Sequence, residues 1–511
     1  MIEATQTATK LGDVIRAGRP VENHFPWPRT IVGRETWGQA TRLLSAGQWT
    51  LNALWAERQQ VHMAVDDNGA YGVLSFACED NRFPSVGRSH PPAIRLERAI
   101  RDLWGLEPEG LADTRPWLDH GRWRLPRARD GGLEAHRVAE RYAFLPAEGE
   151  SLHQIPVGPV HAGIIEPGHF RFTANGEAVV RLEARLGYAH KGIERLMEGA
   201  PLDRASVLAG RVSGDSTVAY ALAFARAVEA AQGIQVPQRA VWLRALMAEL
   251  ERLANHFGDI GAVCNDAAFA MMHAQCGHLR EQVLRVADSC FSHRLMMDRV
   301  VPGGVQRDLP GDGDKLIRSL LVDIRRRFPE LVELYDNTAS LQDRTVGTGI
   351  LSPQLARQYG CGGYVGRASG RKVDVRREPG YPPYDSLRFE VPVREDGDVD
   401  ARIWIRILEV EQSAALIDQL LEQLPSGPIA QPLGARSAPV AREGMALVEG
   451  FRGDVLAWVR TGVDGTVERC HLRDPSWFQW PLLEAAIEGN IVADFPLCNK
   501  SFNCSYSGHD L

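Results

Sequence analysis

Two long stripes of apolar residues set the strongest constraint on how this chain can fold. In both, the apolar residues alternate between three and four positions apart, which keeps them on one face of an α-helix. The stripes consist of Leu243, Leu246, Leu250, Leu253, Phe257 and Ile260, and of Ile403, Ile407, Val410, Ala414, Ile417, Leu421 and Leu424. Four charged residues lie off the first stripe, namely Arg244, Glu249, Glu251 and Arg252. We therefore expect two long helices within a mainly helical bundle.

The first 125 residues have a different character and predict a small domain of their own. Residues 60–65 and 71–76 alternate as strands do, and residues 96–106 carry a helical spacing. The stretch that follows is polar and interrupted by glycine and proline, the composition of a linker. The sequence predicts an α+β domain over 1–125, a linker over 126–152 and a second domain over 153–511.

A β-hairpin is predicted near the start of the second domain. Residues 169–174 and 177–183 are strand-like and flank Asn175 and Gly176. This dipeptide favours a type I′ turn, in which both central residues have positive φ. The fold class is therefore α+β, with helices dominating the second domain and strands at its margins.

Composition excludes several classes of function. The chain has 511 residues, 44% apolar and 24% charged, which is typical of a folded protein with a large core. Its formal net charge of −7, without a basic patch, argues against nucleic acid as a partner. No apolar run is long enough for a membrane-spanning helix, and the N-terminus lacks the apolar core of a signal peptide. We expect a cytosolic protein or one peripheral to a membrane.

The eight cysteines do not form a recognisable metal motif. No two of them are arranged as Cys-x-x-Cys, so neither disulfides nor an iron–sulfur cluster held by this chain alone is expected. The spacing of Cys498, Cys504 and His509 matches no common zinc site. Cys264 and Cys276 lie near histidines in an apolar setting that favours helix packing.

A loop rich in glycine and proline, 158–169, is a candidate functional segment. It contains His161, Glu166 and His169, which such a loop can aim into a cleft for acid–base chemistry. The alternative is a surface loop with solvated histidines.

His190 and Glu194 are a second candidate. They are four positions apart and share a face if the helix has begun at His190, where they could relay protons. The alternative is an ordinary solvated pair. No Gly-x-Gly-x-x-Gly loop, phosphate-binding loop or Gly-x-Ser-x-Gly elbow is present to support nucleotide binding or serine hydrolysis.

Several segments together resemble the large subunits of membrane-bound, energy-converting [NiFe] hydrogenases and the homologous 49-kDa quinone-site subunit of respiratory complex I. They are GPVHAGIIEPGHFRF, RLGYAHKGIERLMEG, MAELERLANHFGDIGAV and the stretch from RASGRKVDV to RILEVEQS. The segment LERAIRDLWGLEPEGLADTRPWL in residues 1–125 resembles the small 30-kDa-type complex I subunit that is fused ahead of hydrogenase-4 and formate hydrogenlyase large subunits. The resemblance covers nearly the whole chain.

The resemblance also locates the nickel ligands of the family, and here they are missing. A working hydrogenase holds nickel and iron with four thiolates. The matching positions are Ser213, Ser216, Ser505 and Gly508. A hydroxyl is a hard, weakly acidic ligand and glycine offers none, whereas nickel in such a site depends on soft thiolates. Cys504 lies one place before a ligand position, and one thiolate could not hold two metals. We expect no metal in this chain and no hydrogen chemistry.

The quinone-binding residues of complex I are also not reproduced. Gly214 stands where complex I has a tyrosine that helps to bind the quinone headgroup. Pro167 stands at the place of a histidine aimed at quinone, with His169 two residues later, while His161 matches a histidine shared by the family.

The resemblance implies a polar pocket near these positions. Arg211 would stabilise a reduced cluster by its charge, and Asp215, Glu194 and His161 would relay protons; these four are the catalytic candidates. The alternative for each is a hydrogen-bonded scaffold residue. The other pocket candidates are Glu166, His169, Ser213, Gly214, Ser216, His509 and Asp510.

The resemblance implies a subunit of a complex I-like, hydrogenase-4-related membrane oxidoreductase. It would take electrons from a [4Fe–4S] cluster on a partner small subunit to a quinone or another acceptor, as an NADH:quinone oxidoreductase does. Antiporter-like and other membrane subunits would be further partners, and the chain would lie in the cytoplasm against the inner face of the cell membrane. The alternatives are a non-catalytic structural or coupling subunit of the same complex and, as the weakest, an active [NiFe] hydrogenase. The electron donor, whether NADH, formate or ferredoxin, stays open.

Overall fold

The computed structural model describes residues 10–120, 142–161, 165–431 and 440–511 and divides into two compact units. The first holds residues 1–143 with 358–360, and the second holds 144–357 with 361–511. Most of the predicted linker, 126–141, lies outside the described residues, so the predicted domain boundaries stay a prediction. Helices and strands occur in both units, which confirms the α+β class.

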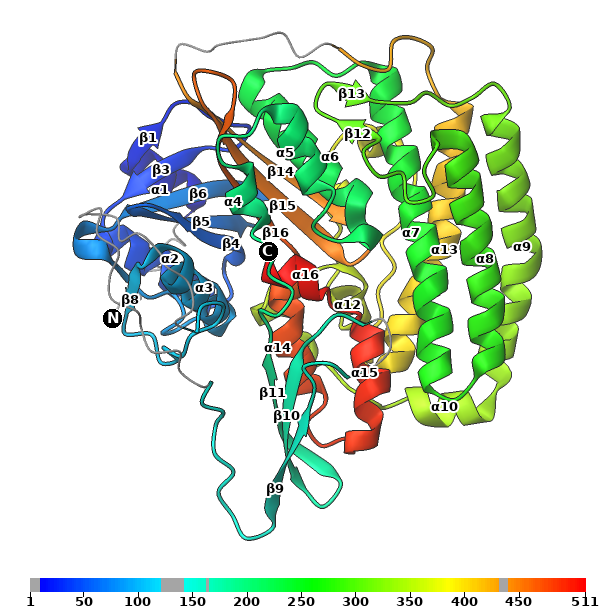
Figure 1. The fold of residues 1–511 in the computed structure, drawn as a ribbon, viewed down its shortest axis with the longest axis horizontal. Coiled ribbons are helices and arrows are strands. Elements are labelled where there is room, and N and C mark those ends of the chain that lie inside the picture. The colour runs from blue at the N-terminus through cyan, green and yellow to red at the C-terminus, as the bar shows by residue number, and fades with distance from the viewer. Residues whose placement is uncertain (1–9, 121–141, 162–164, 432–439) are drawn as a thin grey trace, which may run out of the picture. The chain divides into compact units, whose positions relative to one another are not determined.

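The first unit is built around a twisted five-stranded sheet in the order β1-β3-β6-β5-β4 (Figure 1). Only β3 and β6 are parallel, and the other neighbours are antiparallel. The predicted strands and helix of this region correspond to β5, β6 and α3. The elements are α1 (Leu11–Ala17), β1 (Arg19–Val21), β2 (His24–Phe25), β3 (Arg29–Val32), α2 (Arg34–Ser45), β4 (Thr50–Glu57), β5 (Gln60–Asp67), β6 (Ala70–Ala77), β7 (Arg82–Pro84), α3 (Ile94–Trp104) and β8 (Glu107–Glu109).

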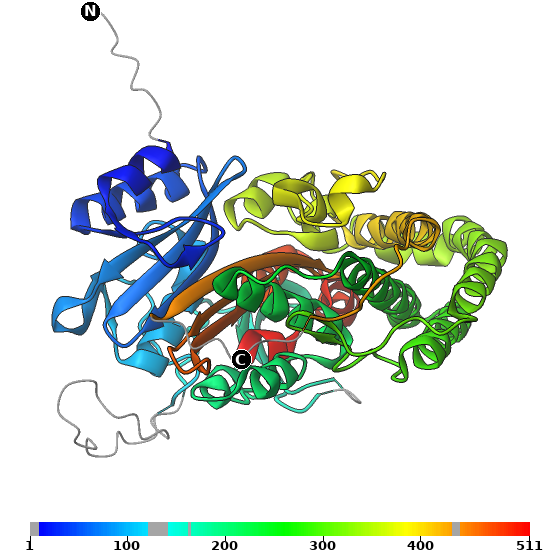
Figure 2. The ribbon, with the colours of Figure 1, turned by 90° about the horizontal axis from the view of Figure 1, so that it is seen from above.

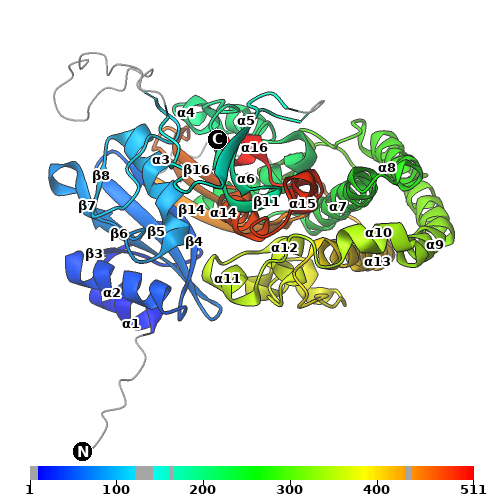
Figure 3. The same cartoon turned by 90° about the horizontal axis from the view of Figure 1, so that it is seen from below.

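Four long helices dominate the second unit and lie side by side in Figure 1. Figures 2 and 3 view the same helices along their axes. Helix α7 packs on both α8 and α13, and α9 packs on α8 and α13. The two predicted stripes lie on α7 and α13, with Leu424 beyond the end of α13. The helices are α7 (Gln238–Asp266), α8 (Ala270–Phe291), α9 (Gly313–Asn337) and α13 (Val399–Glu422).

The charged residues off the stripe of α7 are buried as well. Glu249 is 0% exposed and forms ion pairs with Arg376 and with Arg252 of its own helix. A buried charge is tolerated when it is paired and hydrogen-bonded, so this face of α7 packs through ion pairs instead of facing water.

Three neighbouring antiparallel strands, in the order β16-β15-β14, lie inside the second unit, so strands are not confined to its margins as predicted. Its strands β14 (Arg442–Gly450), β15 (Gly453–Thr461) and β16 (Val467–Arg473) are buried along most of their length. A strand buried on both faces shows no alternation of apolar and polar residues, which explains why the sequence pattern did not reveal it. Helix α6 (Thr217–Gln232) packs on β14 and β15 and is buried on nearly every side.

The predicted hairpin is confirmed, with a different turn. Strands β10 (His169–Asn175) and β11 (Ala178–Arg185) pair antiparallel, and β9 (Leu152–Val157) adds a third strand beside β10. Asn175 belongs to the strand and Gly176 alone has positive φ, at +58°, so the turn residues are Gly176 and Glu177 and the type I′ prediction is wrong. The remaining elements of this unit are α4 (Ile193–Met197), α5 (Leu202–Ala209), β12 (Val300–Val301), β13 (Gly304–Val305), α10 (Ala339–Thr345), α11 (Pro353–Gln358), α12 (Gly363–Ala368), α14 (Ser476–Ala486), α15 (Phe495–Phe502) and α16 (Tyr506–Asp510).

Candidate functional site

The segment that links α5 to α6 carries the first group of candidates. It contains the residues from Gly210 to Ser216 and is closed by the Thr217 hydroxyl, which donates to the carbonyl of Gly210 at 2.8 Å. The hydroxyls of Ser213 and Ser216 both donate to Oδ1 of Asp215, at 2.5 and 3.1 Å. Two of the four thiolate positions are therefore occupied by hydroxyls that already serve a carboxylate.

Arg452, in the turn between β14 and β15, completes this group. Its guanidinium donates to Oδ2 of Asp215 at 2.6 Å and to Oγ of Ser216 at 3.2 Å. Burial alone would raise the pKa of Asp215, but the charge of Arg452 and the two serine hydroxyls lower it to about 2. Asp215 is therefore held as a carboxylate at neutral pH.

The C-terminal helix α16 carries the other two thiolate positions. Ser505 caps this helix, and its Oγ accepts from the backbone N–H of Gly508 at 2.9 Å. A Cβ atom at Gly508 would lie 2.4 Å from Oδ2 of Asp474 and 2.8 Å from Oγ of Ser505. Oδ2 of Asp474 also accepts from the Tyr220 hydroxyl at 2.5 Å. A carboxylate therefore fills the space that a side chain at 508 would need.

These four positions do not fit a nickel–iron centre. They offer three hydroxyls and no thiolate, the hydroxyls are engaged in internal hydrogen bonds, and the glycine has no room for a ligand side chain. Among the described residues, no group of three or more histidine, cysteine, aspartate or glutamate side chains could hold a metal ion elsewhere.

A loop before α4 joins α16 to the 210–216 segment. The backbone N–H of Ala189 donates to Oδ2 of Asp510 at 2.9 Å, and Nδ1 of His190 lies 2.6 Å from the Asp510 carbonyl oxygen. Lys191 donates to the carbonyl oxygens of Arg211 and Val212 at 2.8 and 2.6 Å. The structure thus brings Asp510 and the Arg211 backbone to the same loop.

Two further candidates lie around α16. Oε2 of Glu166 accepts from the backbone N–H of Ser507 at 3.0 Å. His509 is fully buried, stacks on Trp477 with ring centroids 4.1 Å apart, and lies 2.9 Å from Oδ1 of Asp510. Both residues therefore hold the C-terminal helix in place.

Glu194 has different partners from those considered in the sequence. Helix α4 begins at Ile193, so His190 lies outside it and the two residues do not share a helix face. Glu194 forms an ion pair with Arg469 at 2.7 Å and a hydrogen bond with Nδ1 of His471 at 2.8 Å, both on β16. Burial opposes ionisation of Glu194, but these two partners and the Leu472 N–H lower its pKa to about 2.

The side chain of Arg211 binds Asp298. The two side chains form a bidentate ion pair, with N–O distances of 2.8 and 2.7 Å, and each is 37% exposed. Asp298 belongs to the loop after α8, so this pair connects that loop to the 210–216 segment.

The two histidines of the loop 158–169 are placed by the hairpin. Nδ1 of His169 lies 3.2 Å from the carbonyl oxygen of Gly158, and its ring lies 4.9 Å from that of Phe144. The His161 ring lies 6.1 Å from that of Tyr506. Burial and, in addition, the charge of Lys500 lower the pKa of His161. Residues 162–164 of this loop lie outside the described residues.

The sequence did not point to the side chains that pair with these candidate residues or fill the space beside them. Arg452 lies 237 residues after Asp215 in the chain, and Asp474 lies 254 residues after its partner Tyr220. The one available signal is positional, because Arg452 stands in the tight turn between two strand-like segments, where a side chain can leave the sheet.

Comparison with known proteins supplies the family. The residues 266–445 match the family described as the 49-kDa subunit of the respiratory-chain NADH dehydrogenase, and residues 191–258 match the nickel-dependent hydrogenases. Formate hydrogenlyase subunit 5 of Escherichia coli (strain K12) is 34% identical over 84% of this chain and 77% of its own length. The chain belongs to the family of membrane-bound [NiFe] hydrogenase large subunits and complex I 49-kDa subunits.

Two further similar proteins extend the comparison. Hydrogenase-4 component G of Escherichia coli (strain K12) is 31% identical over 90% of this chain and 82% of its own length. The solved structure of a membrane-bound sulfane sulfur reductase, an archaeal respiratory membrane complex, contains a chain that is similar to this one, with a TM-score of 0.67 and 27% sequence identity. The match covers 71% of this chain and 99% of the other. Among the described residues, no helix is long and apolar enough to cross a membrane.

Proposed function

We propose that this chain is an electron-transferring subunit of a complex I-like, hydrogenase-4-related membrane oxidoreductase that works without nickel. It takes electrons from a [4Fe–4S] cluster on a partner small subunit and passes them to a quinone or another acceptor. Its place is on the inner face of the cell membrane, against antiporter-like and other membrane subunits. The chain itself binds no metal.

The single observation that carries the proposal is the occupation of the fourth thiolate position. The Asp474 carboxylate lies where a side chain at Gly508 would project, and Tyr220 and the backbone N–H of Ser476 hold it there. A restored thiolate at 508 would have to displace a buried, hydrogen-bonded carboxylate, which is costly. Hydrogen chemistry has no support in this arrangement.

The acceptor is proposed by class only. Relatives of this chain are named as hydrogenase, NADH-quinone oxidoreductase and sulfane sulfur reductase components, so the fold serves several acceptors. The exposed Gly214 beside the charged Asp215 and Arg211 offers an open place for a neutral acceptor that gains negative charge on reduction. A guanidinium near such an acceptor stabilises the reduced form.

The test uses the complex purified with its partner subunits. Reduced methyl viologen serves as the electron donor and decylubiquinone as the acceptor. We expect turnover in the wild type and at least a tenfold loss in Arg211→Ala and in Asp215→Asn, with the complex still assembled. Arg195→Ala, at an exposed arginine of α4, is the matched control and keeps wild-type turnover. Full turnover in both site variants would refute the catalytic role of this site.

A structural or coupling subunit is the second candidate. It is favoured by the ion pairs that hold Asp215 and Glu194 ionised, which is the usual state of scaffold carboxylates. In that case the two site variants change assembly or stability and leave the turnover of every assembled complex unchanged.

A further inference from the structure

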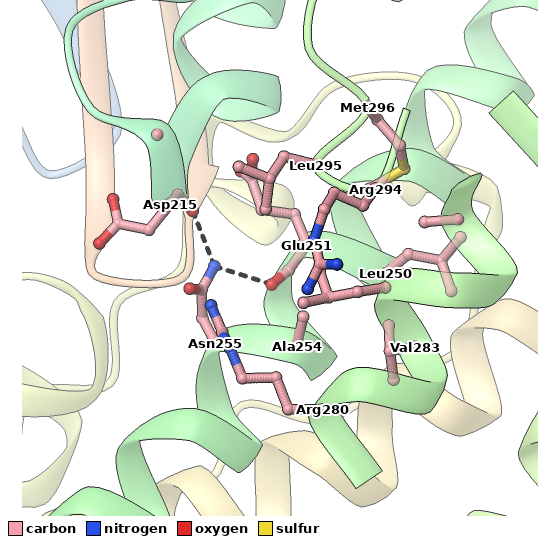
Figure 4. A pocket seen from close by; sticks show the side chains of 13 residues that line it. Asp215, Leu250, Glu251, Ala254, Asn255, Arg280, Val283, Arg294, Leu295 and Met296 are labelled. Carbon is pink, nitrogen blue, oxygen red and sulfur yellow. Dashed lines mark hydrogen bonds between the residues drawn. The ribbon is translucent and has the colours of Figure 1, made fainter. Parts of the chain in front are cut away.

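A narrow cavity opens beside Gly214, between the start of α6 and the helices α7 and α8 (Figure 4). Its interior leaves about 10 Å³ for the centres of water molecules, which is room for about one water, and its mouth is continuous with solvent. Most of its wall is apolar and comes from leucine, alanine, valine and methionine side chains. The polar residues that line it are Asp215, Glu251, Asn255, Arg280 and Arg294.

Glu251 is the carboxyl group buried in this wall. It is 7% exposed, and its two oxygens accept from the backbone N–H groups of Val218 and Ala219 at 2.7 and 3.1 Å. Asn255 lies between Glu251 and Asp215, donating to the backbone carbonyl oxygens of both at 2.9 and 2.7 Å. Glu251 therefore stands at the start of α6, directly behind the segment that contains Gly214.

Its protonation differs from that of the carboxylates considered so far. Burial, the largest cause, and the charge of Asp215 raise the pKa of Glu251, while the two N–H groups and Arg252 lower it; the resulting pKa is about 8. The pKa values of Asp215 and Glu194 lie at about 2 because arginines pair with them. Near neutral pH, Glu251 is thus the one of these three that carries a proton.

Charged groups surround Glu251 on each side of the cavity. The charge of Asp215 acts on it from the 210–216 segment, and Arg252 belongs to its own helix. Arg280 of α8 and Arg294 of the following loop line the same cavity, and Arg294 is itself paired with Glu281 at 2.8 Å. Burial of Glu251 is the main reason that a proton is retained, and the second negative charge that its ionisation would place near Asp215 adds to this effect.

We propose that Glu251 donates the proton that accompanies an electron to an acceptor bound beside Gly214, and that the cavity returns protons to it from solvent. This inference rests on the proposed function. The partner's [4Fe–4S] cluster supplies the electron. The O–H bond of the Glu251 carboxyl breaks, an O–H bond forms on the one-electron-reduced quinone, and the carboxylate then takes a proton from water in the cavity.

The principal test compares Glu251→Gln with Glu251→Asp in the purified complex, with reduced methyl viologen and decylubiquinone. General acid catalysis contributes about 10²-fold or more, so Glu251→Gln should lose about 100-fold in turnover. The wild type should lose activity as the pH rises through about 8, and this decline should disappear in Glu251→Gln. Glu251→Asp, which retains an ionisable group, should recover part of the rate and of the pH dependence.

The matched control is Glu97→Gln in the first unit. Glu97 is also a buried carboxyl group, with a pKa that burial raises to about 7, and it has no part in this site. This variant should keep the wild-type pH profile. Ala254→Leu provides an independent test, since it narrows the cavity without altering Glu251 and should slow steady-state turnover.

The outcomes separate the two proposals. Wild-type turnover and pH profile in both Glu251→Gln and Ala254→Leu would overturn the role of Glu251 while the proposed function stands. An assembled wild-type complex that reduces no quinone would overturn the proposed function, and the inference with it.

Discussion

At Gly508 the lack of a side chain decides what occupies the space between α16 and the end of β16. Asp474 lies in that space and is bound by Tyr220, so the fourth thiolate position is closed by a carboxylate instead of being an empty gap. A group this tightly placed resists the addition of even one carbon atom, because well-packed interiors do not accept extra volume without distortion.

Substituting Gly508→Ala should therefore lower the free energy of unfolding by about 1–3 kcal/mol, measured by thermal or chemical denaturation of the purified chain. Gly277→Ala is the matched control, because this exposed glycine of α8 has no atom within 4 Å of the added Cβ. That change should raise stability by about 0.4–1 kcal/mol through helix propensity. Equal changes in the free energy of unfolding for the two substitutions would show that the space at Gly508 is not tightly filled.

The ion pair of Asp215 with Arg452 predicts a pH-dependent contribution to stability. The pKa of Asp215 is lowered to about 2 in the folded state, so its contribution is complete above about pH 5 and is lost as pH falls from about 4 to 2. Asp215→Asn should cost about 2 kcal/mol at pH 7, a cost that shrinks at low pH. Asp203→Asn, at an exposed site on α5, should cost less than about 0.5 kcal/mol. Denaturant titrations at pH 7 and below pH 4 measure the free energy of unfolding of both variants. A loss in Asp215→Asn that is the same at both pH values would refute the pairing.

Among the elements, the loop after α8 combines strained backbone with an ion pair to the 210–216 segment. Ser292, Met296 and Asp298 have positive φ, at +58°, +53° and +63°, which is costly for residues other than glycine. The loop lines the cavity beside Gly214 through Leu295 and Met296. Asp298 joins it to Arg211, so this pair fixes the loop over the cavity.

Asp298→Asn should free this loop while leaving global stability nearly unchanged. A half-exposed ion pair contributes about 0–1 kcal/mol, so the free energy of unfolding changes little. Hydrogen exchange of residues 292–299 should become faster, because a strained segment with fewer restraints opens locally. Asp323→Asn, which removes an exposed pair with Arg326 on α9, should leave exchange in 292–299 as in the wild type. Unchanged exchange in Asp298→Asn would contradict the role of the pair.

The elements that the sequence predicted are those whose pattern is local. Helices α7 and α13 follow from their apolar stripes, and the hairpin from its strands, but the turn was placed one residue too early because Asn175 continues the strand. The sheet β14–β16 was missed, since buried strands show no alternation. Because Arg452 lies in a turn of this sheet, its role in determining the charge state of Asp215 was missed as well. Long-range pairing of this kind has no signature in spacing.

At the scale of the whole molecule, the chain keeps the architecture of its family. The positions at which the family holds its metal ligands are occupied by other groups. The family positions were identified from motifs, and the structure adds what fills them: hydroxyls bound to Asp215, a helix cap and the Asp474 carboxylate. The acceptor could not be deduced from sequence, because one fold serves several acceptors among its relatives.

If this member of the family works without nickel, elemental analysis of the purified complex will show it. The complex should be isolated with its partner subunits from cells grown with added nickel. The complex should contain iron in the amount that the iron–sulfur subunit requires and nickel well below one atom per complex. One nickel atom per complex would show that the protein works with nickel after all.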